Sequence, residues 1–290
     1  MTSLTPFSLR IFVANGDPDG LRLVERSNWV GKAVMFPRAL LPEVKHRSEF
    51  AQTGVYLLLG PRPDGEGDML YVGEGDPVRP RLESHYAKKD YWTRAVFFVA
   101  GEGQLNKAHV QYLEAQLIQR AAAAKRLPLD NVNQPADPSL SEADRADMDV
   151  FLHHMLGMLP VLGINAFEQA AGAAVGGAPE LLTCKGKGVI AIGYEATQGF
   201  VVKAGSGAAG EEAPSMREYV RGVCDIRRDL KQNGVLQGTG EDYVFTQDYT
   251  FSSPSTAAAV VLGRSANGRI EWKDAKGRTL KELQEKEATS

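Results

Sequence analysis

The chain has 290 residues, of which 43% are apolar and 24% charged, an ordinary composition for a globular protein of one to three domains. Its formal net charge of −3 argues against a protein that coats nucleic acid by charge alone. No apolar run reaches the ~18 residues of a membrane helix, and the first residues lack the basic start and apolar core of a signal peptide. We therefore expect a cytoplasmic protein with no membrane partner.

The first fifty residues alternate between apolar and polar segments. A strand-like stretch at 8–14 leads into the turn NGDPDG at 15–20, and a second apolar run follows at 32–37. A polar segment, PEVKHRSEF, completes this part of the chain. We interpret residues 1–50 as a small β-rich N-terminal element.

Residues 53–75, TGVYLLLGPRPDGEGDMLYVGEG, predict two strands joined by a turn rich in Gly and Pro. Each strand carries a tyrosine beside a glycine motif: Tyr56 closes GVY, and Tyr71 opens YVG. The two phenols lie close together in only some strand registers, and the sequence leaves the register open.

A helix, a strand and a longer helix are predicted after the hairpin. Residues 79–92 favour a helix with Pro80 in its first turn, and the β-formers of 93–101 favour a strand. Residues 105–126 contain no Gly or Pro and predict a helix that ends in LPLDNVNQP.

Several polar side chains of these elements have a spacing that indicates a site. Arg81 follows Tyr71 by ten residues, and His85 lies four further along, on the same helix face. Glu114 stands among apolar residues of the long helix, where a carboxylate needs an ion pair, hydrogen bonds or a metal ion. The helix predicted at 79–92 and the strand after it also carry four further cations, which form either a DNA-binding face or an ordinary solvated one: Arg79, Lys88, Lys89 and Arg94.

These residues, in this order, resemble the GIY-YIG nuclease family over about residues 50–135, with GVY as the first motif and YVG as the second. The resemblance implies an α+β fold in which residues 51–136 form a small antiparallel sheet flanked by helices. It implies hydrolysis of DNA phosphodiester bonds with one divalent ion, Mg²⁺ or Mn²⁺. It also implies a catalytic set: Tyr56, Tyr71, Arg81, His85, Glu114 and Asn131.

The resemblance assigns a role to each member of this set. Glu114 would be the sole protein ligand of the metal, and Arg81 would stabilise charge on the phosphate. Tyr56, helped by Tyr71, would deprotonate or position the attacking water, and His85 would hydrogen-bond Tyr56 or relay a proton. The closing asparagine, for which Asn131 is favoured over Asn133, would orient the metal-site waters or brace the pocket.

Two acids depart from the family pattern. Glu74 and Asp76 follow YVG directly, where they would repel DNA or hold a second cation.

The functions that the resemblance suggests are restriction, phage defence and mobile-element biology. A structure-specific DNA repair nuclease and a catalytically idle nucleic-acid-binding protein stay open as alternatives. A one-metal site would cut a duplex either as a homodimer or by two successive nicks.

Residues 137–180 are interpreted as an acidic linker with a connecting helix, which Ser141 caps at its start. Residues 181–290 form a separate α+β domain in this reading, with one helix at 216–234. Its strands are predicted at 188–196, 199–206, 242–251, 257–263 and 268–274. The two cysteines, Cys184 and Cys224, show no metal-ligand spacing, and we expect buried thiols.

The motifs FSSPS, AAAVVLG and NGRIEW resemble a domain of unknown function often found at the C-terminus of GIY-YIG proteins. The SSPS stretch suits a helix N-terminus, with Pro254 in the first turn and a serine as cap. Those serines, Arg264, Arg269 and the basic segment 217–231 motivate a DNA-targeting role. Trp272 is interpreted as a core residue of a strand, in preference to a base-stacking one.

Overall fold

The chain divides into two compact units, Met1–Phe167 and Glu168–Ser290. The computed structural model describes residues 6–63, 67–101, 103–132, 138–168, 179–186, 188–197, 199–214, 216, 220–238 and 242–288. None of the helices in these ranges is long and apolar enough to cross a membrane. Both units combine helices with antiparallel strands, which agrees with the expected α+β class.

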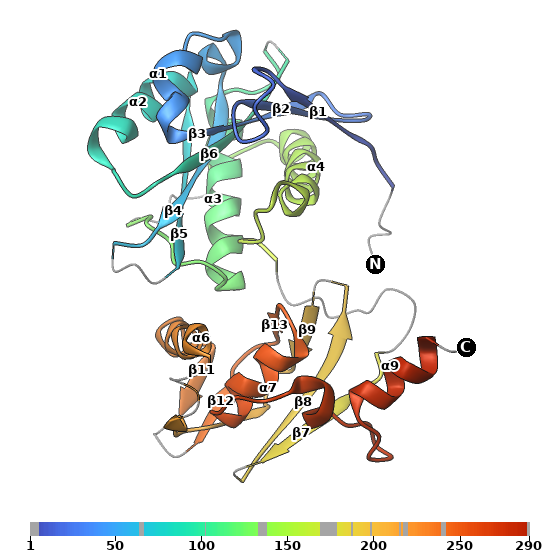
Figure 1. Ribbon diagram of the computed structural model, residues 1–290. Helices are drawn as coiled ribbons and strands as arrows, with labels where there is room; N and C mark the ends of the chain where they lie inside the picture. The colour runs from blue at the N-terminus through green and yellow to red at the C-terminus, as the bar shows by residue number, and fades with distance from the viewer. Residues whose placement is uncertain are drawn as a thin grey trace. The chain divides into compact units, whose positions relative to one another are not determined.

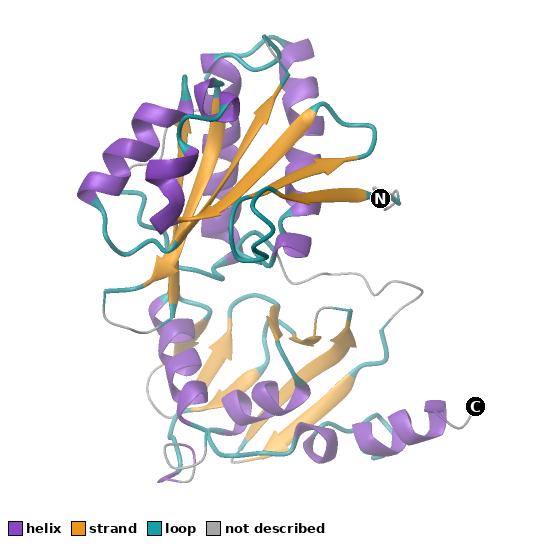
Figure 2. Cartoon of the chain, turned by 45° about the horizontal axis from the view of Figure 1, so that its top comes forward, coloured by secondary structure: helices purple, strands orange, loops and turns teal. Residues whose placement is uncertain are grey.

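The first unit is built on one antiparallel sheet of six strands (Figures 1 and 2). The strand order is β1 (Leu9–Val13), β2 (Arg22–Arg26), β3 (Gly31–Pro37), β6 (Arg94–Ala100), β4 (Gly54–Pro61) and β5 (Asp68–Gly75).

Strands from the first fifty residues therefore join those of the hairpin, and a boundary at residue 50 does not divide the fold. The reason lies in β6, whose residues are almost all buried. β6 pairs with β3 on one side, from Gly31–Ala100 to Pro37–Arg94, and with β4 on the other. An apolar strand of this kind needs a neighbour at each edge.

Helices cover both faces of this sheet (Figure 1). The short α1 (Leu41–Val44) and the longer α2 (Val78–Lys88) lie on one face, where their core includes Tyr56, Leu58 and Phe97. Where this unit is described, its elements are also connected by the 3-10 turns η1 (Arg38–Leu40), η2 (Ser48–Ala51) and η3 (Pro160–Leu162).

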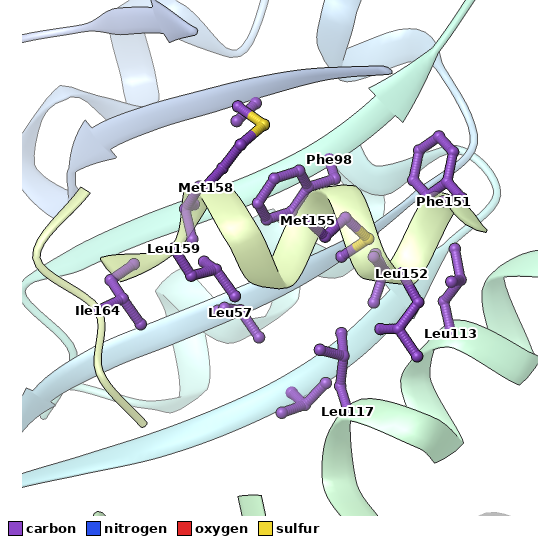
Figure 3. Packing of buried hydrophobic residues seen from close by; sticks show 14 of the residues in the cluster. Leu57, Phe98, Leu113, Leu117, Phe151, Leu152, Met155, Met158, Leu159 and Ile164 are labelled. Atoms are coloured by element: carbon purple, nitrogen blue, oxygen red, sulfur yellow. The ribbon is translucent and has the colours of Figure 1, made fainter. Parts of the chain in front are cut away.

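The other face is covered by α3 (Lys107–Ala124) and α4 (Glu142–Met158). Figure 3 shows residues of α4, such as Leu152 and Met155, packing with Leu57 of β4 and Leu117 of α3. Ser141 is the N-cap of α4 and accepts a hydrogen bond from the Asp144 amide, as predicted. The helix expected in the linker is thus part of the core of the first unit.

The described residues of the second unit form a four-stranded and a three-stranded sheet, both antiparallel. The first has the order β13 (Tyr249–Phe251), β9 (Gly199–Val202), β8 (Val189–Ala196) and β7 (Leu182–Gly186), and the second has the order β10 (Gly207–Ala209), β12 (Asp242–Phe245) and β11 (Leu236–Gly238). Its described helices are α6 (Arg221–Gln232), α7 (Pro254–Leu262), α8 (Gly268–Glu271) and α9 (Leu280–Ala288).

Two strand predictions for this unit are wrong. Residues 257–263 belong mostly to α7, and 268–274 begin with α8. Ser253 caps α7 by accepting a hydrogen bond from the Thr256 amide, and Pro254 occupies the first helical position. Every residue of α7 from Ala257 to Leu262 is buried, so the helix shows no amphipathic periodicity and its sequence resembles a core strand.

Trp272 lies in the core, as expected, although it follows α8 and is not part of a strand. Its side chain is fully buried, and its ring centroid lies 4.5 Å from that of Phe200. The indole N–H donates a 3.0 Å hydrogen bond to the carbonyl oxygen of Pro254. The indole therefore ties α8 to the first turn of α7 and is not available to stack on a base.

Replacing Trp272 tests this packing. We expect Trp272→Phe to lower the free energy of unfolding by about 1–3 kcal/mol, because the hydrogen bond to the Pro254 carbonyl is lost and the smaller ring leaves a cavity in the core. Urea denaturation of the full chain measures the loss. Ile270→Ala, at a side chain that is 50% exposed two residues away, is the control and should change stability by less than about 0.5 kcal/mol. Equal losses in the two variants would contradict the role given to the indole.

Candidate active site

The register of the hairpin brings its two tyrosines together. Tyr56 of β4 pairs with Gly73 of β5, and Leu58 pairs with Tyr71. The two phenols are therefore diagonal neighbours on the same face of the sheet. Their rings are stacked, with centroids 6.2 Å apart and planes inclined by 28°. The sequence left the strand register open, and the observed register is one that places both phenols side by side, as a shared site requires.

The glycines of the two motifs make this arrangement sterically possible. A Cβ atom on Gly73 would lie 2.4 Å from both Cζ and Oη of Tyr56, well inside van der Waals contact. A Cβ on Gly54, the glycine of GVY, would lie 2.3 Å from the carbonyl oxygen of Phe98 on β6. Gly73 thus leaves room for the Tyr56 ring, and Gly54 leaves room for the neighbouring strand.

Helix α2 places two further predicted residues against the tyrosines. Val78 and Leu82 anchor it in the core, and Arg81 and His85 lie one turn apart on its surface. The Tyr56 hydroxyl and Nε2 of His85 are 2.8 Å apart, and the His85 ring lies 4.7 Å from that of Tyr71. Tyr56 also shares side-chain hydrogen bonds with Arg81 and Tyr71.

Burial sets the protonation states of this cluster. It raises the pKa of Tyr56 far above its usual value, with a smaller contribution from Tyr71, and it also raises the pKa of Tyr71. Burial, helped by Lys89 and Arg81, lowers the pKa of His85 to about 4. At neutral pH both phenols are therefore protonated, and His85 is a neutral imidazole whose Nε2 can accept a proton.

Glu114 approaches the same edge of the sheet from α3, on the opposite face. Its side chain is half-buried, and burial followed by the charge of Glu74 raises its pKa to about 7, although Arg81 and Lys107 oppose this. The ionised carboxylate is thus destabilised by its surroundings, which is the electrostatic condition that a bound cation would relieve. Among the described residues, no cluster of three or more His, Cys, Asp or Glu side chains is arranged to hold a metal.

The two extra acids beside YVG both have partners. Nζ of Lys107, the first residue of α3, lies 2.6 and 2.7 Å from the two carboxylate oxygens of the buried Glu74. Asp76 accepts a 2.6 Å hydrogen bond from the hydroxyl of Thr53. Sequence reasoning missed Lys107, because no local pattern links the start of α3 to the end of β5.

Asn131 binds the backbone of the edge strand β5. Its side-chain amide donates to the carbonyl oxygen of Val72 at 2.8 Å, and its side-chain oxygen accepts from the Val72 amide at 3.0 Å. Around it, the Asp130 amide donates to the Leu70 carbonyl, and the Leu70 amide donates to the Pro128 carbonyl. Both polar atoms of Asn131 therefore brace the strand that carries Tyr71. Asn133 lies outside the described residues.

The four expected DNA-binding cations occupy different surroundings. Lys88 is exposed at the end of α2, and Arg79 is partly buried in its first turn. Lys89 is ion-paired with Asp130, and its ammonium lies 4.8 Å from the centre of the Tyr71 ring. Arg94 lies two and four residues before Val96 and Phe98 in β6, so it is on the same face of the sheet as they are. This is the face covered by α3, opposite the tyrosines. The structure thus brings Lys89, but not Arg94, to the phenols.

Several of the residues proposed for DNA targeting in the second unit form hydrogen bonds or ion pairs within it. Ser253 caps α7, and Oγ of Ser255 accepts from the Gly268 amide. Arg264 forms a 2.7 Å ion pair with Glu271. The buried Arg227 of the basic segment donates to the carbonyl oxygens of Ala209 and Val260 and pairs with Glu212. Arg217 of the same segment lies outside the described residues.

Residues 182–284 match the family model of a domain of unknown function, DUF4357. This range contains the motifs FSSPS, AAAVVLG and NGRIEW, so the expectation of a C-terminal domain of unknown function is confirmed. No nuclease family model supports the resemblance of residues 50–135. Neither a curated protein nor a solved structure matched the chain.

A methyl group at position 73 tests the close passage of the Tyr56 ring. We expect Gly73→Ala to destabilise the chain by about 1–3 kcal/mol, because the new Cβ overlaps the phenol and the ring cannot move without breaking its contact with His85. Gly101→Ala is the matched control, because its Cβ would meet nothing nearer than 3.8 Å. Denaturant unfolding measures both variants, and a Gly73→Ala protein as stable as Gly101→Ala would contradict the packing.

The pKa of Glu114 predicts a dependence of stability on pH. Because the pKa rises from 4.5 to about 7 on folding, the folded state holds the proton more tightly, and stability falls as pH increases through this window. Without divalent metal, Glu114→Gln should therefore be more stable than the natural chain at about pH 8, by about 1 kcal/mol after allowance for partial exposure.

Thermal unfolding in a metal chelator at several pH values measures this difference, which should vanish toward about pH 4. Glu142→Gln, at an exposed position in the first turn of α4, is the control and should show no such trend. A stability difference for Glu114→Gln that is the same at both ends of the range would rule out a raised pKa at this position.

Proposed function

We propose that this chain is a metal-dependent endonuclease that hydrolyses DNA phosphodiester bonds at the edge of β5. The observation that carries the proposal is the 2.8 Å contact between the Tyr56 hydroxyl and a neutral His85, with Tyr71 and Arg81 beside it. A buried phenol–imidazole pair has little use in a protein that only binds nucleic acid, whereas it offers a proton acceptor to a hydrolase.

The exposed fractions assign the two tyrosines different parts in this reaction. Tyr56 is fully buried, whereas Tyr71 is partly exposed. Tyr71 is therefore the phenol that would meet a water molecule, and Tyr56 would connect it to His85. This order differs from the one that the family resemblance implies, in which Tyr56 handles the water.

A proton relay follows from this order. In one concerted transfer, the attacking water gives a proton to Tyr71 while Tyr71 passes its own to Tyr56 and Tyr56 passes its own to Nε2 of His85, so both phenols stay neutral. The new O–P bond forms as the P–O bond to the leaving sugar oxygen breaks, and that oxygen takes a proton from solvent. Because its pKa is about 4, protonated His85 returns its proton to water readily at neutral pH.

Arg81 and Glu114 would act on the phosphate. Arg81 lies next to Tyr56 and is exposed, so its guanidinium can donate to the phosphate oxygens as negative charge develops on them. Glu114 would hold Mg²⁺ or Mn²⁺, since Mg²⁺ keeps several waters and needs only one or two carboxylates. When bound, such an ion would neutralise charge on the phosphate.

DNA is the proposed partner. The kind of DNA that is cut would distinguish this proposal from two alternatives, a repair nuclease and a catalytically idle binding protein. A repair nuclease of the same chemistry would prefer branched or damaged DNA, and an idle binding protein would cut none. Cleavage of both strands requires either a homodimer or two successive nicks. The side chains of Ser253, Ser255 and Arg264 already bind groups within the second unit, so they do not support DNA targeting by that unit.

Incubation of the full chain with plasmid, single-stranded and branched DNA, in Mg²⁺ or Mn²⁺, tests the activity. We expect cleavage by the natural chain, and a loss of at least about 100-fold in Glu114→Gln with little loss of DNA binding. Glu142→Gln should cleave at the natural rate. If Glu114→Gln cleaves as well as the natural chain, the metal site lies elsewhere, and if no substrate is cut the nuclease proposal fails.

A further inference from the structure

Lys89 joins two segments that flank Tyr71. It follows α2, and its amide donates a 2.9 Å hydrogen bond to the His85 carbonyl oxygen, which fixes its backbone at the helix end. Its ammonium pairs with the carboxylate of Asp130 and lies 4.8 Å from the centre of the Tyr71 ring. Both charged side chains are 27% exposed, so the pair is only partly screened by solvent.

Asp130 is held in place by β5 itself. Its amide donates to the carbonyl oxygen of Leu70 at 2.8 Å, and the next residue, Asn131, binds both backbone polar groups of Val72. Leu70 and Val72 are the two neighbours of Tyr71 in the strand. The segment that carries Asp130 therefore fixes the backbone on each side of the Tyr71 Cα.

The ring of Tyr71 is held by three contacts. Tyr56 stacks on it, the His85 ring lies 4.7 Å away, and the ammonium of Lys89 contributes a cation–π contact. An ammonium that is already neutralised by Asp130 and directed at a ring has little capacity left to neutralise a phosphate. The neighbouring Lys88 is exposed, and no ion pair joins its ammonium to any residue that the structure describes, so it can contact a phosphate.

We propose that Lys89, through its ion pair with Asp130, is a positioning residue that holds the Tyr71 ring in the active site, and that it does not contact DNA phosphates. The role in catalysis rests on the proposed nuclease function, whereas the positioning of the ring does not. By sequence alone Lys89 belongs with the expected DNA-binding cations; of the two neighbouring lysines, the exposed Lys88 is the one we expect to contact a phosphate.

Four variants of the full chain separate these roles: Lys89→Met, Lys89→Arg, Asp130→Asn and Lys88→Met. The first measurement is the ring signal of Tyr71 in chains labelled with ¹³C-tyrosine, without DNA or metal, assigned by its loss in Tyr71→Phe. We expect Lys89→Met and Asp130→Asn to shift or broaden this signal, Lys89→Arg to preserve it, and Lys88→Met to leave it unmoved. An unmoved Tyr71 signal in a folded Lys89→Met chain overturns the proposal even if no DNA is ever cleaved.

The second measurement is cleavage and binding of a short fluorescent DNA duplex. Lys89→Met should lower kcat by roughly tenfold with KM and the salt dependence of binding unchanged, because a misplaced Tyr71 affects the chemical step. Lys89→Arg should recover most of kcat. Lys88→Met should instead weaken binding and reduce the slope of log K against log salt by about 0.9, as the loss of one phosphate contact does. A Lys89→Met chain with unchanged kcat and a reduced salt slope would show that Lys89 contacts DNA.

Discussion

The close passage of the Tyr56 ring over Gly73 is the constraint on which the site depends. It is possible only because position 73 has no side chain and because β4 and β5 pair in the register that sets these two residues opposite each other. The same register makes Tyr71 the diagonal neighbour of Tyr56 and turns both phenols toward α2. A shift by one residue would turn one strand's tyrosine to the opposite face and separate the two rings. The geometry of the candidate site is therefore set by the strand pairing of this hairpin.

The position of β5 at the edge of the sheet explains how groups from both faces can meet. The tyrosines and His85 belong to the α2 face, whereas Glu114 belongs to α3 on the other face, yet the charges of Glu114 and Arg81 act on the pKa of both phenols. In the interior of a sheet the intervening strands would separate such groups. At an edge, side chains from the two covering helices can reach the same volume of solvent, which would suit the DNA substrate proposed above.

Local patterns predicted much of the first unit. The hairpin, α2, β6, α3 and the Ser141 cap follow from alternation, helix propensity and capping, which act over short stretches of sequence. β2 was missed because RLVER is short and charged at both ends. In the second unit the uniform burial of α7 removed the helical period that would have identified it. A resemblance of ordered motifs supplied the candidate set of Tyr56, Tyr71, Arg81, His85 and Glu114. The contacts of Lys107 and Asp130 could be found only from the fold, because their partners Glu74 and Lys89 are 33 and 41 residues away in the sequence.

The hydrogen bonds between Asn131 and Val72 also have a consequence for folding during synthesis. The two residues are 59 positions apart, and during synthesis β5 emerges well before the segment that covers it. Until residues 128–131 arrive, the nascent chain presents an apolar strand with a free hydrogen-bonding edge, the kind of surface that recruits a second chain. The segment that braces the candidate site thus also covers the edge of the sheet and protects it against aggregation. A premature end of translation within α3 would leave a product with its sheet edge open, a natural target for chaperones and proteases.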